Sequence, residues 1–190
     1  MSIIVTVPES EAAGPVAELY ADDVDAQGYV AAHTKVLGLN PGALLAWNEL
    51  SRAITVQMDR RRYELVTLAA ARGARSAHCL LAHGRVASRY LSEEQLIRLA
   101  RGDLRGAGLT PAEVAMMEFA ERVSRDAADM TEADGLRLRE AGFTDREIVD
   151  IALAAAARNF YSRAVQALAV EVEPPADVSA ELRAALVDGL

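Results

Sequence analysis

The chain has 190 residues, of which 52% are hydrophobic and 25% charged, which suits a single compact domain over residues 1–190. Its 20 basic and 28 acidic residues leave a net charge of −8, so we expect no nucleic-acid partner, because such partners are bound through a net basic surface. No apolar run approaches the ~20 residues that span a membrane, and the first residues do not resemble a secretory signal. We therefore expect a cytoplasmic protein with no membrane partner.

Helix signals recur along the whole chain and strand signals are almost absent, which predicts an all-α fold. Three segments join a capping hydroxyl to a Glu or Gln three residues later, and these are Ser92 with Gln95, Thr110 with Glu113, and Thr144 with Glu147. Apolar residues follow a helical period between such starts. The expected helices cover residues 10–22, 28–38, 41–57, 60–73, 76–90, 93–101, 111–128, 132–141, 145–169 and 178–187.

The helix ends and faces carry further expectations. Gly142 should follow the end of one helix, and Pro174-Pro175 should end the long helix before the tail. Alanine-rich segments such as 151–157 have narrow faces that suit tight bundles or subunit seams, although alanine is also simply a good helix former. We expect the tail helix at 178–187 to pack on a neighbouring subunit.

One segment, residues 63–83, holds the only cysteine and two of the three histidines. Ser76 is a good N-cap, which would place Cys79 in the first turn of a helix, where free amides and the helix dipole favour a thiolate. Cys79 and His83 are four residues apart and so share one helix face. If the preceding helix pairs with this one through a short turn, Glu64 would face both side chains, giving a proton relay around a nucleophilic sulfur.

Plainer interpretations compete with this one. A lone cysteine on an alanine-rich helix is most often a small buried hydrophobe, and a histidine four residues later is often only packed. Glu64 follows Arg60, Arg61 and Arg62 and could merely pair with a neighbour.

Two other kinds of site are less favoured. A zinc ion could bind Cys79 and His83, but His78 lies on a different face and the remaining ligands would have to be His33 or distant carboxylates, so we expect no metal ion. His33 is better interpreted as a surface or packed histidine. A serine hydrolase is less favoured still, because neither Ser76 nor Ser162 lies in a glycine-rich elbow.

The segment resembles the core motif of the AhpD-like, carboxymuconolactone decarboxylase superfamily. In its peroxidase branch, a glutamate is followed twelve residues later by a Cys-x-x-Cys-x-x-x-His run, often with a histidine just before the second cysteine. Glu64 lies twelve residues before Ser76, and Ser76-Ala77-His78-Cys79-Leu80-Leu81-Ala82-His83 follows that run. The departure is Ser76, which stands where the family has its first cysteine.

The resemblance extends beyond this motif. Residues 157–163 are similar to the closing helix of the family, so the likeness covers about residues 45–170. Residues 1–44 would then form an N-terminal helical layer and residues 171–190 a tail helix. The resemblance implies an AhpD-like helical bundle that assembles as a homo-oligomer, a dimer, trimer or hexamer, with the thiol in an apolar cleft. Candidates for the wall of that cleft are Trp47, Tyr63, Phe160 and Tyr161.

The resemblance also implies roles for five site residues. Cys79 matches the cysteine that peroxide attacks, Glu64 and His83 would relay its proton, and His78 would tune that relay. Because Ser76 replaces the resolving cysteine, the sulfenate would need an external thiol or dithiol reductant, or a cysteine of another chain.

The favoured function is therefore a thiol-dependent peroxidase, an antioxidant enzyme without a cofactor, acting on hydrogen peroxide or small organic hydroperoxides. One alternative is a lactone decarboxylase or another cofactorless acid-base enzyme, in which Ser76, His83 and Glu64 move protons and Cys79→Ala is tolerated. A second alternative is a non-enzymatic helical assembly protein in which the motif is a relic and the thiol is unreactive.

Overall fold

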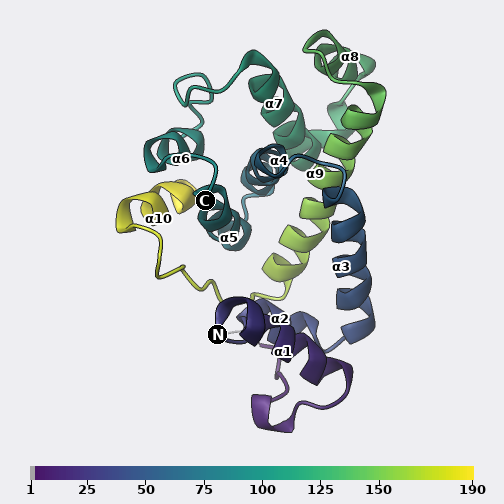
Figure 1. Ribbon diagram of the computed structural model, residues 1–190, viewed down its shortest axis with the longest axis vertical. Helices are drawn as coiled ribbons and strands as arrows, with labels where there is room; N and C mark the ends of the chain where they lie inside the picture. Colours follow the sequence, from purple (N-terminus) through teal and green to yellow (C-terminus); the bar gives the residue numbers. More distant parts are fainter. Residues whose placement is uncertain (1–2) are drawn as a thin grey trace.

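The computed structural model describes residues 3–190, which form ten α-helices and no strand (Figure 1). The helices are α1 (Pro15–Gln27), α2 (Ala32–Leu37), α3 (Pro41–Thr55), α4 (Arg60–Gly73), α5 (Ala77–Ala87), α6 (Glu93–Ala100), α7 (Pro111–Asp126), α8 (Glu132–Glu140), α9 (Asp145–Ala167) and α10 (Ala180–Val187). Two 3₁₀ turns lie at Glu9–Glu11 and Ala127–Asp129. The predicted all-α fold is confirmed. No helix of residues 3–190 is both long and apolar enough to cross a membrane.

The predicted caps set the helix starts. All three expected capping boxes form, at the beginnings of α6, α7 and α9, and Thr131 with Asp134 makes a further one at α8. Gly142 follows α8 with a φ of +96°, a conformation that glycine adopts without strain.

Several helix boundaries differ from the prediction, among them those of α1, α2 and α9. Helix α1 begins at Pro15 instead of residue 10, because proline fits the first turn, and it continues to Gly28, whose φ of +88° closes it. Helix α2 begins four residues later than expected. Helix α9 ends at Ala167 and Ala169 follows with a φ of +48°, so Pro174-Pro175 lies beyond the end and does not cause it.

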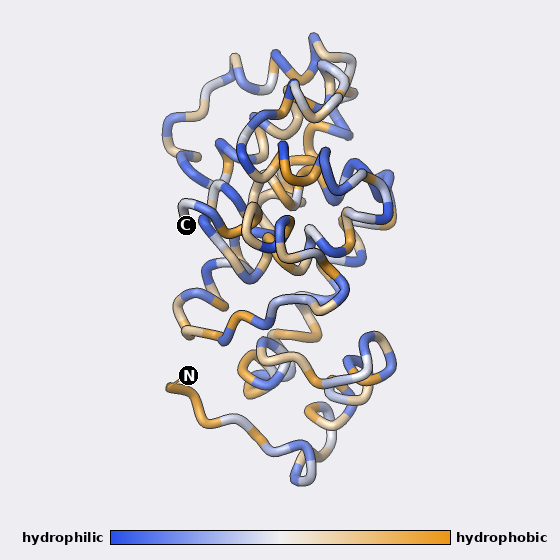
Figure 2. Tube along the Cα trace, turned by 90° about the vertical axis from the view of Figure 1, so that its left-hand side faces the viewer, coloured by the Kyte–Doolittle hydropathy of each residue, from blue (hydrophilic) through white to orange (hydrophobic). Residues whose placement is uncertain are grey.

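Helix α4 is the centre of the bundle and packs against α5, α7 and α9 (Figure 1). Every residue from Tyr63 to Ala71 is buried. A Cβ atom on Gly73 would overlap the carbonyl oxygen of Glu121 in α7, so this glycine allows the two backbones to approach. Figure 2 shows hydrophobic positions gathered inside the upper part of the trace and hydrophilic ones along its outer turns.

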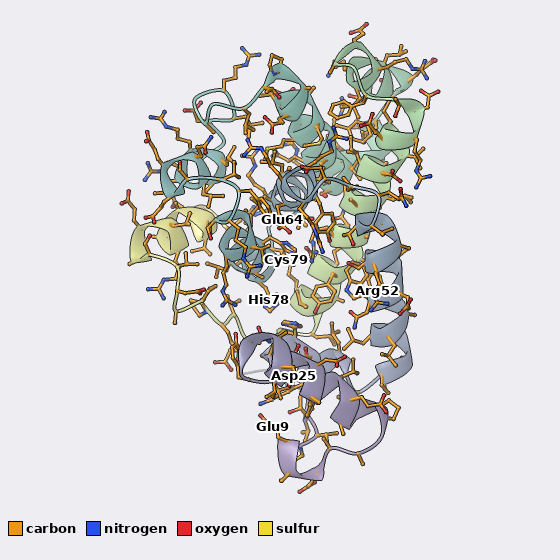
Figure 3. The ribbon with its side chains drawn as sticks, in the orientation of Figure 1. Glu9, Asp25, Arg52, Glu64, His78 and Cys79 are labelled. Carbon is orange, nitrogen blue, oxygen red and sulfur yellow. The ribbon has the colours of Figure 1, made fainter. Side chains whose placement is uncertain are left out.

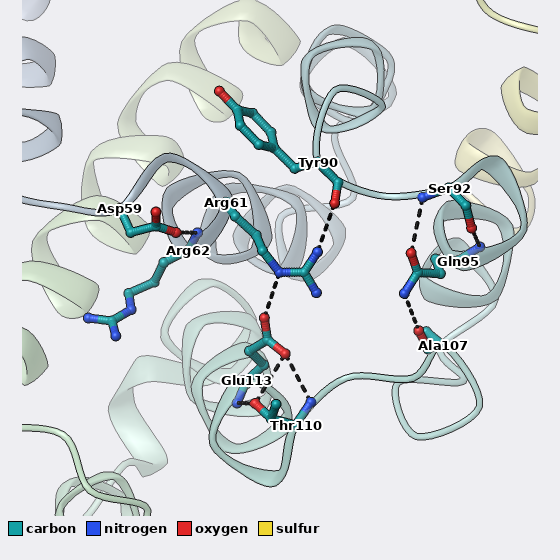
Figure 4. A network of polar contacts seen from close by, with 9 residues as sticks. All are labelled: Asp59, Arg61, Arg62, Tyr90, Ser92, Gln95, Ala107, Thr110 and Glu113. Carbon is teal, nitrogen blue, oxygen red and sulfur yellow. Dashed lines mark hydrogen bonds and ion pairs between the residues drawn. The ribbon is translucent and has the colours of Figure 1, made fainter.

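A polar network fixes the start of α4 (Figure 4). Arg61 Nε donates to Glu113 of α7 at 2.8 Å, and its Nη1 donates to the carbonyl of Tyr90 at 2.8 Å. The Asp59 carboxylate caps the helix by accepting from the Arg62 amide at 3.0 Å. The first turn of α4 is thereby held against both α7 and the turn after α5.

Helix α10 does not need a neighbouring subunit to cover it. It packs on α5 and α6 of its own chain, and Leu182 and Leu186 are buried there. A Cβ atom on Gly84 would lie 2.5 Å from Leu186 Cδ1, so the small residue in α5 makes room for the tail. Contact of residues 178–187 with another subunit stays a prediction.

Candidate functional site

A cavity of about 540 Å³ lies among α3, α4, α5 and α9, with Cys79 in its wall (Figure 3). Trp47, Tyr63 and Tyr161 line this cavity, as expected of them. Phe160 is 60% exposed and stacks on Trp47 with ring centroids 5.6 Å apart. It therefore supports the wall without lining it.

The first turn of α5 holds the thiol. Ser76 Oγ accepts a hydrogen bond from the Cys79 amide at 3.4 Å, so Cys79 lies in the first turn, as the N-cap predicts. Cys79 is only 1% exposed, and Ser76 is fully buried. The Ser76 hydroxyl is engaged in capping the helix.

Glu64 and His83 meet across the α4–α5 hairpin. Glu64 Oε2 lies 2.8 Å from His83 Nδ1, and Glu64 is 3% exposed. With Nδ1–H donating to the carboxylate, Nε2 is left as a proton acceptor. Burial and the positive charge of Arg158 lower the pKa of His83 below 6.5, despite the opposing effect of Glu64, so its imidazole is neutral at neutral pH.

Helix α9 supplies the polar partners of the sulfur. The Ser162 hydroxyl donates to Cys79 Sγ at 3.2 Å, and Arg158 Nη1 lies 3.8 Å from the same atom. Arg158 Nη2 also donates to the Tyr63 hydroxyl at 3.4 Å. Arg158 is 6% exposed, and no carboxylate within residues 3–190 forms an ion pair with it. Burial opposes its charge, but Cys79 and Tyr63 outweigh that effect and raise the pKa of Arg158.

The sequence interpretation missed both α9 residues. It included both in the segment resembling the family's closing helix, and otherwise considered Ser162 only as a hydrolase nucleophile. A usable signal exists, because Arg158 directly follows the apolar run 151–157 and Ser162 is four residues further on the same helix face.

His78 lies apart from the Glu64–His83 pair. Its ring packs edge-on against His33 of α2 with centroids 4.9 Å apart, and His33 also contacts Tyr161 at 5.8 Å. Burial, with smaller effects of His78 and Arg158, lowers the pKa of His33 to about 3. His33 is thus a packed histidine that lines the cavity, and the N-terminal layer forms part of its wall.

Within residues 3–190, no group of three or more His, Cys, Asp or Glu side chains has the proximity that a metal ion needs.

No family model matches the sequence, and no curated protein matches it either. Solved structures do. The crystal structure of an uncharacterized peroxidase-related protein from Ralstonia eutropha JMP134, an alkylhydroperoxidase AhpD core, superposes with a TM-score of 0.79 at 22% identity, over 98% of this chain and 97% of that one. The chain has the AhpD-like fold.

Two further structures share this AhpD-like fold. A peroxidase-related protein from Silicibacter sp. TM1040 is 23% identical, with a TM-score of 0.67 over 93% of this chain and 95% of that one. The debrominase Bmp8, in a Cys-to-Ala variant with bound 2,3,4-tribromopyrrole, is 17% identical, with a TM-score of 0.76 over 98% of each chain. The AhpD-like resemblance is confirmed as a fold, and it runs through the N-terminal and C-terminal helices as well as the motif.

Proposed function

We propose that this protein is a thiol-dependent peroxidase that reduces hydrogen peroxide or small organic hydroperoxides through Cys79. One observation carries the proposal. The buried sulfur borders a cavity, with a permanent cation and a hydroxyl on one side and a neutral His83 bonded to Glu64 on another. Two of the solved structures with this fold are peroxidase-related by name, which favours the same chemistry.

The first step oxidises the thiol. Arg158 and Ser162 stabilise the Cys79 thiolate, since a cation and a hydroxyl donor both favour the anion. The sulfur attacks the terminal oxygen of the hydroperoxide, so a sulfur–oxygen bond forms as the oxygen–oxygen bond breaks. Sulfur loses two electrons, and the peroxide gains them and leaves as an alkoxide.

His83 moves the proton in this step. Its neutral imidazole accepts the thiol proton, and Glu64 stabilises the resulting cation through Nδ1. The imidazolium then gives that proton to the departing alkoxide, which leaves as an alcohol, or as water when the substrate is hydrogen peroxide. Protons balance without a metal or cofactor.

The second step returns sulfur to the thiol state. Cys79 is the sole cysteine of the chain, so an external thiol attacks the sulfenic acid, releasing water and forming a mixed disulfide. A second thiol, or the second sulfur of a dithiol, then releases Cys79. The proposal places this activity in the cytoplasm, as an antioxidant function of a homo-oligomer, with His78 tuning the relay.

A turnover assay tests the proposal. Hydroperoxide consumption in excess dithiol is expected for the parent and lost in Cys79→Ser, while Arg105→Gln, a change on an exposed residue of the α6–α7 loop, keeps the parent rate. If a Cys79→Ala variant consumed hydroperoxide at the parent rate, the proposal would be contradicted. The decarboxylase, which needs no thiol, would then be favoured.

Debromination of a small aromatic compound is a second candidate. The observation that favours it is the match to a debrominase crystallised with a brominated pyrrole, together with the aromatic side chains Trp47, Tyr63 and Tyr161 around this cavity. Replacing bromine by hydrogen takes two electrons, which two thiols supply on becoming a disulfide. Incubating the protein with tribromopyrrole and dithiol and measuring bromide distinguishes this candidate, which predicts bromide release that Cys79→Ser abolishes.

A further inference from the structure

The charge lining the cavity is opposite to that of the chain. Arg52, Arg60 and Arg158 line it, and Glu64, bonded to His83, is the single carboxylate among the described residues that do so. The whole chain carries −8. A cavity lined by positive charge concentrates negatively charged ligands. Because the chain as a whole is acidic, this attraction for anions is confined to the cavity.

The three arginines lie at two depths. Arg158 is buried, with Nη1 3.8 Å from Cys79 Sγ. Arg52 lies on α3 across from Cys79 (Figure 3), with a side chain 67% exposed. Arg60 is exposed at the start of α4. Two cations therefore lie at the solvent end of the cavity, apart from the one that serves the thiol.

The two outer arginines are open to a ligand. Arg60 forms no ion pair with any residue of 3–190, and Arg52 pairs only with Glu49 on the same exposed helix surface. Exposed pairs of this kind contribute little to stability, so an incoming carboxylate competes with Glu49 at small cost. Trp47 and Tyr161 line the same cavity as the outer arginines and Cys79, and their rings suit an apolar or aromatic body.

We infer that the preferred substrate is an organic hydroperoxide with an apolar, aromatic body and a carboxylate at the end remote from its oxygen–oxygen bond. The peroxide end reaches Cys79, the body contacts Trp47 and Tyr161, and the carboxylate is bound by Arg52 and Arg60. This substrate class rests on the proposed function and adds the two outer arginines as specificity-determining residues. Guanidinium groups suit this role because their planar donors match a carboxylate.

A matched pair of peroxides tests the inference. Cumene hydroperoxide and its para-carboxylate derivative have the same reacting group and differ in one remote charge. Cys79 sulfenate formation at low ionic strength is expected to be at least about tenfold faster with the carboxylate, and the ratio should shrink as salt is added. In an Arg52→Gln/Arg60→Gln variant the ratio should fall toward one, whereas Arg105→Gln should keep it. The inference would be overturned if the two peroxides reacted at equal rates with the parent protein. It would also be overturned if the ratio of the two rates were unchanged in the double variant.

A binding measurement separates this inference from the proposed function. Trp47 is the only tryptophan of the chain and lines the cavity, so its fluorescence reports occupancy. In Cys79→Ser protein, para-isopropylbenzoate is expected to bind at least about tenfold more tightly than the neutral para-isopropylbenzamide, with Arg52→Gln/Arg60→Gln abolishing the difference. If Cys79 proves inert to both peroxides while this preference holds, the peroxidase proposal fails and the anion selectivity stands. Equal binding of acid and amide overturns the selectivity, whatever the thiol does.

Discussion

The α4–α5 hairpin and helix α9 line the same cavity around Cys79 with side chains of different chemistry. The hairpin brings Glu64 and His83, which gain and lose protons, whereas α9 brings Arg158, which stays charged, and the neutral hydroxyl of Ser162. On this account the thiolate is stabilised by a charge that does not change with pH, and the proton is moved by a pair that does. The pH dependence of the reaction should therefore be set by Glu64 and His83 of the hairpin.

The largest effect is expected from removing the fixed charge. Arg158→Met keeps an apolar side chain in the buried site but takes away the cation, and we expect sulfenate formation to slow by about 100-fold or more, the effect of losing a charged donor at a reacting centre. Arg158→Lys should restore part of the rate, since it keeps the charge but not the fork that also reaches Tyr63. Stopped-flow measurement of sulfenate formation checks this, with circular dichroism to show that the variants are folded. If Arg158→Met reacted as fast as the parent, Arg158 would have no role in stabilising the thiolate.

Removing the proton carrier should cost somewhat less. His83→Ala is expected to slow sulfenate formation by about 100-fold at most, and Glu64→Gln by about tenfold, because proton transfer and the orientation of its base are lost in turn. The same rapid-mixing measurement gives both rates. If both variants reacted as fast as the parent, the hairpin would have only a structural role.

The pH profile separates the two elements further. Because the pKa of His83 is lowered, the parent should keep its rate as pH falls to the ordinary value of 6.5 and lose it only below, where His83 becomes protonated. Arg158 lowers that pKa and Glu64 raises it, so Arg158→Met should move the loss to higher pH and Glu64→Gln to lower pH. His83→Ala should lack this loss altogether. Shifts in the same direction for the two variants would contradict the assignment.

The hairpin also depends on a close backbone approach. A methyl group at Gly73 meets the Glu121 carbonyl and Ser124 Cβ, so Gly73→Ala should lower the free energy of unfolding by about 1–3 kcal/mol. Gly135 in α8 has nothing within 4 Å of such a methyl group, and Gly135→Ala should raise stability by about 0.5–1 kcal/mol. Urea denaturation of both variants checks this, and equal effects would show that α7 yields to the added group.

The smallest effect is expected at the neutral partner. Ser162→Ala removes one uncharged donor 3.2 Å from the sulfur, and sulfenate formation should slow by about 2- to 10-fold, with the pH profile unchanged. A loss as large as that of Arg158→Met would mean that the hydroxyl, and not the charge, holds the thiolate.

The same two elements show how far sequence reasoning reaches. Ser76, Cys79 and the pairing of Glu64 with His83 were predictable because a cap, a four-residue spacing and a short turn are local patterns. Arg158 and Ser162 follow Cys79 by 79 and 83 residues, and only the packing of α9 on the hairpin brings them to the sulfur.

Helix boundaries show the same limit. The capping boxes predicted the starts of α6, α7 and α9. The start of α1 was placed too early, because the acidic residues before Pro15 were included in the helix although it begins at that proline. The contacts of α10 with α5 and α6 could not be predicted, because a helical pattern does not say whether its apolar face is covered by the same chain or by another.

Time-resolved trapping of the Cys79 sulfenate in the reduced parent protein shows whether peroxide attacks this sulfur. Protein is mixed with hydroperoxide from about pH 5 to 9, quenched with a sulfenate-specific reagent and analysed by mass spectrometry. We expect rapid modification at Cys79 that fades at acid pH as His83 is protonated. A thiol that stays reduced under excess peroxide across this range would contradict it, leaving the motif as a relic or as the site of a different reaction.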